Sequence, residues 1–290
     1  MTSTVLGGAS VVMLREATSL ILRSPRHLQF GTVPSHSLVL AVPDGVSANQ
    51  VMLVLREARR PVESADLATR LGHCGFSPEH ADGILDDLRT AELLRPVPPT
   101  GAATVHVTGT TGMSGALLQE LMRCGVTAAP VTPGAPAFGR LSGRSLVVLA
   151  GQLFPPQDVT HRLMEQGVPH LPCGVLDGQV VIGPLVQPGT TPCLTCIDTQ
   201  MLAEDPEWRL VRAQAPVGEG RTASSMTGLA ATVFAGIVRD ILGARTTGGP
   251  AAVPAVRRFL DPVSLDVTEM RPVQVPGCPS CQAALSGSSG

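Results

Sequence analysis

Two pairs of cysteines have the residue type and the spacing of metal ligands. Cys193 and Cys196 enclose two residues, and Cys278 and Cys281 repeat this C-x-x-C pattern further along the chain. A two-residue spacer lets both sulfurs of a pair turn toward one ion, and four thiolates complete a closed tetrahedral Zn²⁺ site. Because four ligands leave no position for a water, we expect a structural rather than a catalytic zinc.

Two other interpretations of these cysteines stay open: a pair of redox-active dithiols, or thiols without a common role. The remaining three, Cys74, Cys124 and Cys173, are isolated in apolar or helical surroundings, which predicts buried and unreactive side chains. If one metal joins the two pairs, it fixes the end of the chain to its middle. Residues 193 to 281 then belong to one domain.

The composition narrows the possible classes of function. A chain of 290 residues can form one large or two ordinary domains, and 43% hydrophobic against 15% charged residues is too apolar for disorder. A net charge of −2 provides no basic field for nucleic acid. All 21 basic residues are arginine, so mechanisms that need a Schiff-base, P-loop or kinase lysine are excluded.

The chain carries no charged-then-apolar leader, and we find no apolar run of about 18 residues. These observations predict a cytoplasmic protein with no membrane partner. Its thiols would be reduced, which favours a thiolate–zinc site over disulfides.

Residues 1–98 are predicted to form a small α+β domain of winged-helix-like pattern. Short strands at 19–22, 28–30 and 37–42 precede three helices, of which the second is expected to end at Gly72 and the third to begin after Ser77. The third helix has Ile84 and Leu88 on its apolar face, but it is acidic and would be repelled by phosphates. We therefore expect a structural role here or a peptide-binding one, in which the strand at 37–42 and the third helix around Ile84 and Leu88 form the peptide groove. Nucleic acid is not an expected partner.

Residues 99–285 are predicted to form a Rossmann-like α/β domain. A strand at 104–108, a turn with Gly109, Gly112 and Gly115, a helix and a strand at 126–131 make a βαβ unit. A strand at 145–150, a helix at 158–166 and a strand at 169–173 continue it, and a small-residue helix at 224–242 is expected to be buried, with a subunit interface as one possibility. Strands at 257–260 and 264–270 form a closing hairpin, and the tail after residue 284 is predicted to be disordered.

Two segments support a family resemblance: G-P-L-V-x-P-G-x-T-x-C-x-x-C at residues 183–196 and P-G-C-P-x-C at residues 276–281. With the glycine turn and the long helix, this order resembles the ThiF/MoeB/E1-like superfamily. It is most similar to the bacteriocin (TOMM) cyclodehydratase partner proteins, which bind precursor leader peptides for YcaO enzymes. The resemblance implies a structural zinc on the four cysteines, an N-terminal PqqD-like winged-helix domain and a homodimer.

The nucleotide-binding residues of that superfamily are matched only in part. Its catalytic members carry G-x-G-x-x-G, whereas this chain has G-x-x-G-x-x-G with Thr111 at the second position. Residues 131–133 contain no carboxylate for a ribose, and Gln152 stands near the place of a magnesium-associated aspartate. Losing three or four charge-assisted contacts of ~1.5–3 kcal/mol each removes most of a micromolar affinity of about 8 kcal/mol. Bound ATP is therefore not expected, and Gly109, Gly112 and Gly115 would form a degenerate cofactor turn.

Three functional hypotheses follow. The favoured one is a protein without catalytic residues that binds a precursor peptide and docks a YcaO-type enzyme. The alternatives are an ATP-dependent adenylyltransferase acting on a peptide or protein C-terminus, and a DNA-binding regulator that senses metal or redox state. Arg257 and Arg258 are expected at a solvated strand end, and Trp208 at a half-buried position, with a partner anchor as the alternative.

Overall fold

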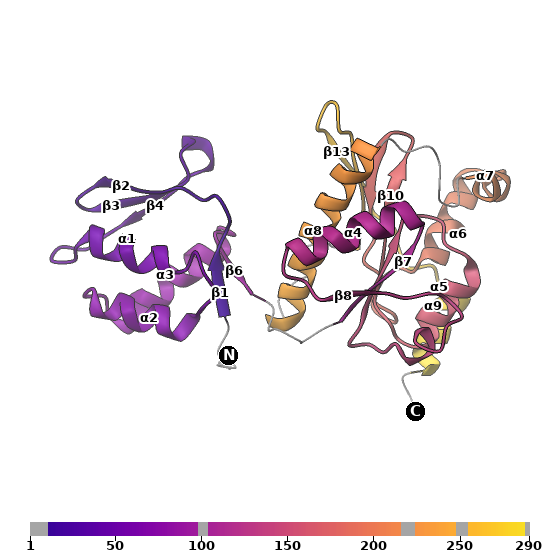
Figure 1. The fold of residues 1–290 in the computed structure, drawn as a ribbon, viewed down its shortest axis with the longest axis horizontal. Helices are drawn as coiled ribbons and strands as arrows, with labels where there is room; N and C mark the ends of the chain where they lie inside the picture. Colours follow the sequence, from indigo (N-terminus) through magenta and orange to yellow (C-terminus); the bar gives the residue numbers. More distant parts are fainter. Residues whose placement is uncertain (1–10, 98–103, 216–223, 248–254, 288–290) are drawn as a thin grey trace. The chain divides into compact units, whose positions relative to one another are not determined.

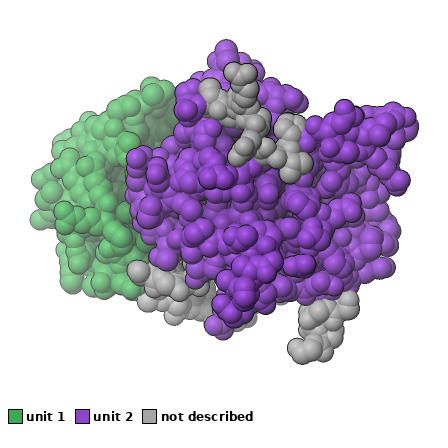
Figure 2. Space-filling view, turned by 45° about the vertical axis from the view of Figure 1, so that its right-hand side comes forward, with its two compact units in different colours: residues 1–100, 243–249 green, residues 101–242, 250–290 purple. Residues whose placement is uncertain are grey.

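The computed structural model describes residues 11–97, 104–215, 224–247 and 255–287. The chain divides into two compact units, one of residues 1–100 with 243–249 and one of residues 101–242 with 250–290 (Figure 2). The predicted boundary between residues 98 and 99 lies outside the described residues.

The first unit contains the predicted strands and helices in the predicted order, with further strands that the sequence analysis missed. Three strands form an antiparallel meander in the order β2-β3-β4, and β1 pairs with β5 and β6 in a second sheet (Figure 1). The elements are β1 (Val11–Leu14), β2 (Leu20–Ser24), β3 (His27–Phe30), β4 (Leu38–Ala41), α1 (Ala48–Glu57), β5 (Val62–Glu63), α2 (Ser64–His73), α3 (Pro78–Thr90) and β6 (Leu94–Pro96).

Two local expectations for this unit need correction, and one is confirmed. The helix α2 does not end at Gly72 but continues to His73, and Gly75 adopts the left-handed backbone beyond it. The side chains of Ile84 and Leu88 are buried in the core of the unit, so they cannot line a peptide groove as predicted. Ser77 caps α3 as expected, because its hydroxyl accepts a hydrogen bond from the His80 N–H.

The second unit is built on a seven-stranded sheet in the order β13-β12-β11-β10-β9-β7-β8. The strands β8, β7, β9 and β10 are parallel, as a doubly wound fold requires, and β11 to β13 are antiparallel additions. Their bounds are β7 (Val105–Gly109), β8 (Ala128–Pro130), β9 (Leu146–Ala150), β10 (His170–Leu176), β11 (Gln179–Ile182), β12 (Arg257–Leu260) and β13 (Val267–Met270).

Helices cover both faces of this sheet (Figure 1). On one face, α4 (Thr111–Arg123) and α8 (Ser224–Thr247) pack on the side chains of Val107 and Val148. On the other face, α5 (Gln157–Glu165), α6 (Leu194–Glu204) and α9 (Pro279–Gly287) pack on Val147 and Leu149, while α7 (Trp208–Gln214) follows α6. Because successive side chains of a strand point to opposite faces, the fully buried β9 supplies both cores.

Two expectations about the end of the chain and the long helix were wrong. The tail forms α9 up to Gly287, and residues 288–290 lie outside the described part. Residues 224–245 of α8 reach a mean hydropathy of 1.4 over a length that could cross a membrane, although no such run was predicted. Ala230, Phe234 and Val238 of this helix are fully buried against the sheet, and 44% of its apolar window is buried, so core packing accounts for part of its apolar composition.

Candidate metal centre

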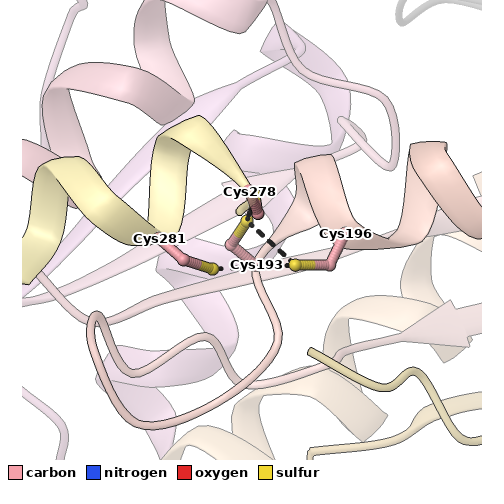
Figure 3. A group of neighbouring side chains, drawn as sticks. All are labelled: Cys193, Cys196, Cys278 and Cys281. Carbon is pink, nitrogen blue, oxygen red and sulfur yellow. Dashed lines mark hydrogen bonds between the residues drawn. The ribbon is translucent and has the colours of Figure 1, made fainter. Parts of the chain in front are cut away.

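Each cysteine pair lies at the start of a helix. Cys193 caps α6, and Cys196 follows in its first turn. Cys278 directly precedes α9, and Cys281 lies in the first turn of that helix. The positive end of a helix dipole stabilises a thiolate, so both helices favour the charged, metal-binding form of the sulfur. The four side chains converge from these two helix starts (Figure 3).

The distances between the sulfurs suit a tetrahedral ion. All four sulfurs lie within 4.8 Å of one another. The Sγ of Cys193 is 3.8 Å from that of Cys196 and 3.6 Å from that of Cys278, and the Sγ atoms of Cys196 and Cys281 are 3.6 Å apart. A disulfide would need about 2 Å, whereas sulfurs about 2.3 Å from a tetrahedral Zn²⁺ lie about 3.8 Å apart. The buried cluster of four free thiols could therefore hold a metal ion.

Hydrogen bonds around the cluster join the two cysteine pairs. The hydroxyls of Thr195 and Ser280, which occupy the same position within each pair, are hydrogen-bonded at 2.8 Å. The Val275 N–H donates to the Sγ of Cys196 at 3.4 Å. Partners outside the ligand shell orient ligands and tune their basicity. The surroundings thus hold both helix starts in one arrangement.

Burial and hydrogen bonding act on these thiols in opposite directions. Burial raises the pKa of Cys193 far above its ordinary value and that of Cys281 to about 11. Burial also opposes ionisation of Cys196, but hydrogen bonds, first that from the Val275 N–H, outweigh it and lower the pKa of this thiol. Metal binding would then have to release protons from the cluster, so affinity for a metal should increase with pH.

One glycine of the turn makes a close contact with the neighbouring strand. Gly109 ends β7 with φ at 138°, and a Cβ there would overlap the Ala150 carbonyl oxygen of the neighbouring β9. Gly112 and Gly115 lie within α4, and a Cβ on either would meet no other atom within 4 Å. Only Gly109 is therefore required for a close approach, and it is an approach of strand to strand.

The strand order reverses between β7 and β9, which is the point where doubly wound sheets bind nucleotides. Here the Thr110 N–H donates to the Ala150 carbonyl at 3.0 Å, so the two strands stay bonded past Gly109. The Thr110 side chain lies so close to Gly151 that a Cβ on that glycine would overlap its hydroxyl. These contacts hold β7 and β9 together past Gly109, while Thr111 and Gly112 at the start of α4 are exposed. Residues 109–111 and 150–152, at the ends of the two strands, include no charged side chain for a phosphate, a ribose or a magnesium ion, so the residues present do not match the charged contacts that a nucleotide needs.

A second polar cluster lies beside the metal centre, and the sequence analysis missed it. Arg257, predicted to be solvated, is only 5% exposed, and its Nε donates to the Gly183 carbonyl at 3.0 Å. Asp198 of α6 bonds Arg212 at 2.8 Å and accepts from the Trp208 indole at 3.3 Å. Trp208 is half-buried, as expected. Because these side chains come from separate elements, no local pattern could have predicted the cluster.

The sequence matches no known protein family and no curated protein. The fold is similar to solved structures of low sequence identity. A heterocyclase in complex with substrate and cofactor has a TM-score of 0.56 at 14% identity, over 94% of this chain and 39% of that chain. The heterocyclase TruD has a TM-score of 0.54 at 16% identity, over 94% and 43%. This chain thus spans about two-fifths of those heterocyclases.

A third similar structure matches over its own full length. The microcin C7 biosynthetic enzyme MccB, in complex with N-formylated MccA, has a TM-score of 0.53 at 11% identity. The likeness covers 93% of this chain and 99% of MccB. At such identities these comparisons establish the fold alone.

Proposed function

We propose that this protein is a non-catalytic E1-like scaffold that binds a precursor peptide and presents it to a modifying enzyme in peptide natural-product biosynthesis. The observation that carries the proposal is the uncharged strand reversal, where residues 109–111 and 150–152 at the ends of β7 and β9 supply no charged side chain. An adenylating enzyme needs an open crevice there, together with charged residues for ATP. This chain has the cluster of four thiols but lacks such charged residues at the ends of β7 and β9.

The proposed metal is a structural Zn²⁺ held by Cys193, Cys196, Cys278 and Cys281. Four thiolates at sulfur separations of 3.6–3.8 Å fit a closed zinc site better than any oxygen-preferring cation. When bound, the ion would crosslink α6 to α9. The role of the protein's own residues is to present four converging sulfurs from two helix starts.

The proposed peptide site is the free edge of β4 in the first unit, whose assignment as a PqqD-like winged-helix domain is part of the proposal. The strand β4 pairs only with β3 among the described strands. The Val42 N–H donates inward to the Arg26 carbonyl, so by alternation Val39 and Ala41 direct their backbone groups outward. An extended peptide could add there as a further strand by β-augmentation, with Val39, 40% exposed, beside it.

The proposed partners are a precursor peptide and a modifying enzyme. MccB was solved with a peptide, MccA, and the heterocyclase with a substrate, which supports a peptide partner here. The heterocyclases are longer than this chain, which spans about two-fifths of them, and as the modifying enzyme we propose one of the YcaO type. A homodimer in the cytoplasm completes the proposal.

Two assays on the purified, metal-loaded chain test this function against its main alternative. Captured peptides from host lysate, identified by mass spectrometry, should include one short precursor that recurs and is displaced by its synthetic copy. Exchange of labelled pyrophosphate into ATP should stay at background with that peptide present. Exchange above background would instead identify an adenylyltransferase, and a lysate that yields no recurring peptide contradicts the scaffold.

A further inference from the structure

The carboxyl end of β9 carries a pocket with more positive than negative charge. The loop after this strand supplies Leu153, Phe154 and Pro155, while α6 supplies Asp198 and α7 supplies Arg212. Together with Arg257 of β12 they surround a cavity of about 10 Å³, which is room for one water-sized group. The loop that supplies the pocket follows the carboxyl end of β9, at the edge where doubly wound sheets bind ligands.

Both guanidinium groups of the pocket are fixed by backbone carbonyls of the same loop. Arg257 donates to the Leu153 carbonyl at 3.5 Å, and its guanidinium carbon lies 5.9 Å from the centre of the Phe154 ring. Arg212 donates to the Pro155 carbonyl at 3.2 Å. Neutral carbonyls orient these cations without cancelling their charge, so the cations are preorganised for a further negative group.

The carboxylate of Asp198 interacts electrostatically with both arginines of the pocket. It bonds Arg212 at 2.8 Å and provides the charge that acts on buried Arg257. Burial lowers the pKa of Arg257 to about 10, with the Asp198 charge acting in the opposite direction, so this side chain remains a cation at neutral pH. Among the residues that line the pocket, two cations therefore face one anion, and the group carries one net positive charge.

We infer that this pocket binds a carboxylate group, which places one oxygen in the cavity between Arg212 and Arg257. A ligand with a charge of −1 neutralises the net positive charge of the pocket, and guanidinium N–H groups form strong hydrogen bonds to carboxylate oxygens. Asp198 and Arg212 are each 23% exposed at their side chains, so the mouth of the pocket reaches solvent and can admit the rest of the ligand. The site is separate from the β4 edge and does not depend on peptide binding there.

Trp208 supplies a direct readout, because it is the only tryptophan and its indole donates to Asp198. We expect sodium formate, at constant ionic strength, to change its fluorescence in a saturable way, whereas formamide, which is neutral and of similar size, should not. Arg212→Gln should weaken the formate response at least tenfold. Arg209→Gln, an exposed arginine of the same helix, is the matched control and should leave it unchanged.

A response that is linear in formate, equal for formamide, or equal in Arg212→Gln and the unmodified chain would overturn the inference. A parallel titration with N-acetylglycine shows which source of carboxylate the pocket accepts. If N-acetylglycine and formate both bind, the pocket accepts the carboxylate of a peptide. If only formate binds, it accepts a free small anion. If Arg212→Gln does not fold, crystals of the unmodified chain soaked in bromide provide the second test. An anomalous peak between Arg212 and Arg257 is expected there, and its absence contradicts the site.

Discussion

At the scale of single residues, the cysteines at 193, 196, 278 and 281 act as a set, so the loss of one should affect the whole cluster. We predict that Cys278→Ser lowers bound zinc from one ion per chain to well below half. It should also reduce the free energy of unfolding by several kcal/mol, because metal binding and folding are coupled. Metal analysis and denaturant unfolding measure these effects.

The control for this variant is Cys124→Ser, which replaces a half-buried thiol at the end of α4, away from the cluster. It should keep its zinc and most of its stability. Equal metal content in Cys278→Ser and the unmodified chain would show that the four thiols do not act as one site.

Substitution by alanine should destabilise the protein at one glycine of the turn and stabilise it at another. At Gly109, Ala would overlap the Ala150 carbonyl and adopt a backbone angle that L-residues avoid, so we expect Gly109→Ala to cost more than about 3 kcal/mol. Gly115 is an exposed helical position with free space, and Gly115→Ala should stabilise the protein by about 0.5–1 kcal/mol. Thermal unfolding of the two variants decides whether the turn is structural, since comparable losses at both positions would contradict this.

The buried side chain of His170 should make the stability of the folded protein depend on pH. It is fully buried, its Nδ1 lies 2.9 Å from the Val168 carbonyl, and burial lowers its pKa to about 4. The unfolded chain therefore binds this proton from about pH 6.5 downward while the folded chain remains neutral, and stability is lost between about pH 6.5 and 4. The full loss is about 3 kcal/mol for this group.

Comparison with His170→Asn isolates the contribution of this residue. Loss of metal in acid affects both proteins, so it cancels in the difference between their unfolding free energies. Relative to pH 7, the unmodified chain should lose more stability than the variant by pH 4.5. Parallel pH profiles would show that His170 does not stay neutral in the folded state.

At the scale of elements, we predict that substitutions at the free edge of β4 affect peptide binding. Val39→Pro removes an outward N–H that an added strand would use, while β3 keeps its hydrogen bonds to β4. Val39→Thr retains this N–H and changes only the side chain. Binding of the captured peptide, measured by fluorescence anisotropy, should weaken at least tenfold with proline and stay within a few-fold with threonine. Equal affinities would exclude the β4 edge.

The sequence predicted most elements of the second unit because their patterns are local. The buried run before Gly151, the Asp-Gly turn between β10 and β11 and the hairpin of β12 and β13 each lie in a short window. It did not predict α9, whose Ser- and Gly-rich end resembles a disordered tail, since packing against α5 stabilises that helix. It also misplaced Arg257 and Ile84, because burial at these positions depends on contacts with distant elements.

The candidate site shows the same division between local and distant information. The spacing within each cysteine pair was visible in the sequence, and the structure brings all four thiols together. The contact of Thr110 with Gly151 could not be read from the chain, because the two residues meet only through the register of β7 with β9. The degenerate glycine spacing was the one signal that pointed toward it.

At the scale of the whole molecule, the central claim is that the proposed E1-like scaffold holds a metal ion on its four cysteines and does not bind ATP. Isothermal titration of the zinc-loaded chain with magnesium–ATP tests this claim most directly. We predict no binding heat at millimolar ATP, because residues 109–111 and 150–152 at the strand reversal supply no charged side chain for the triphosphate or its magnesium ion. A saturable isotherm with micromolar affinity and about one ATP per chain would contradict the account.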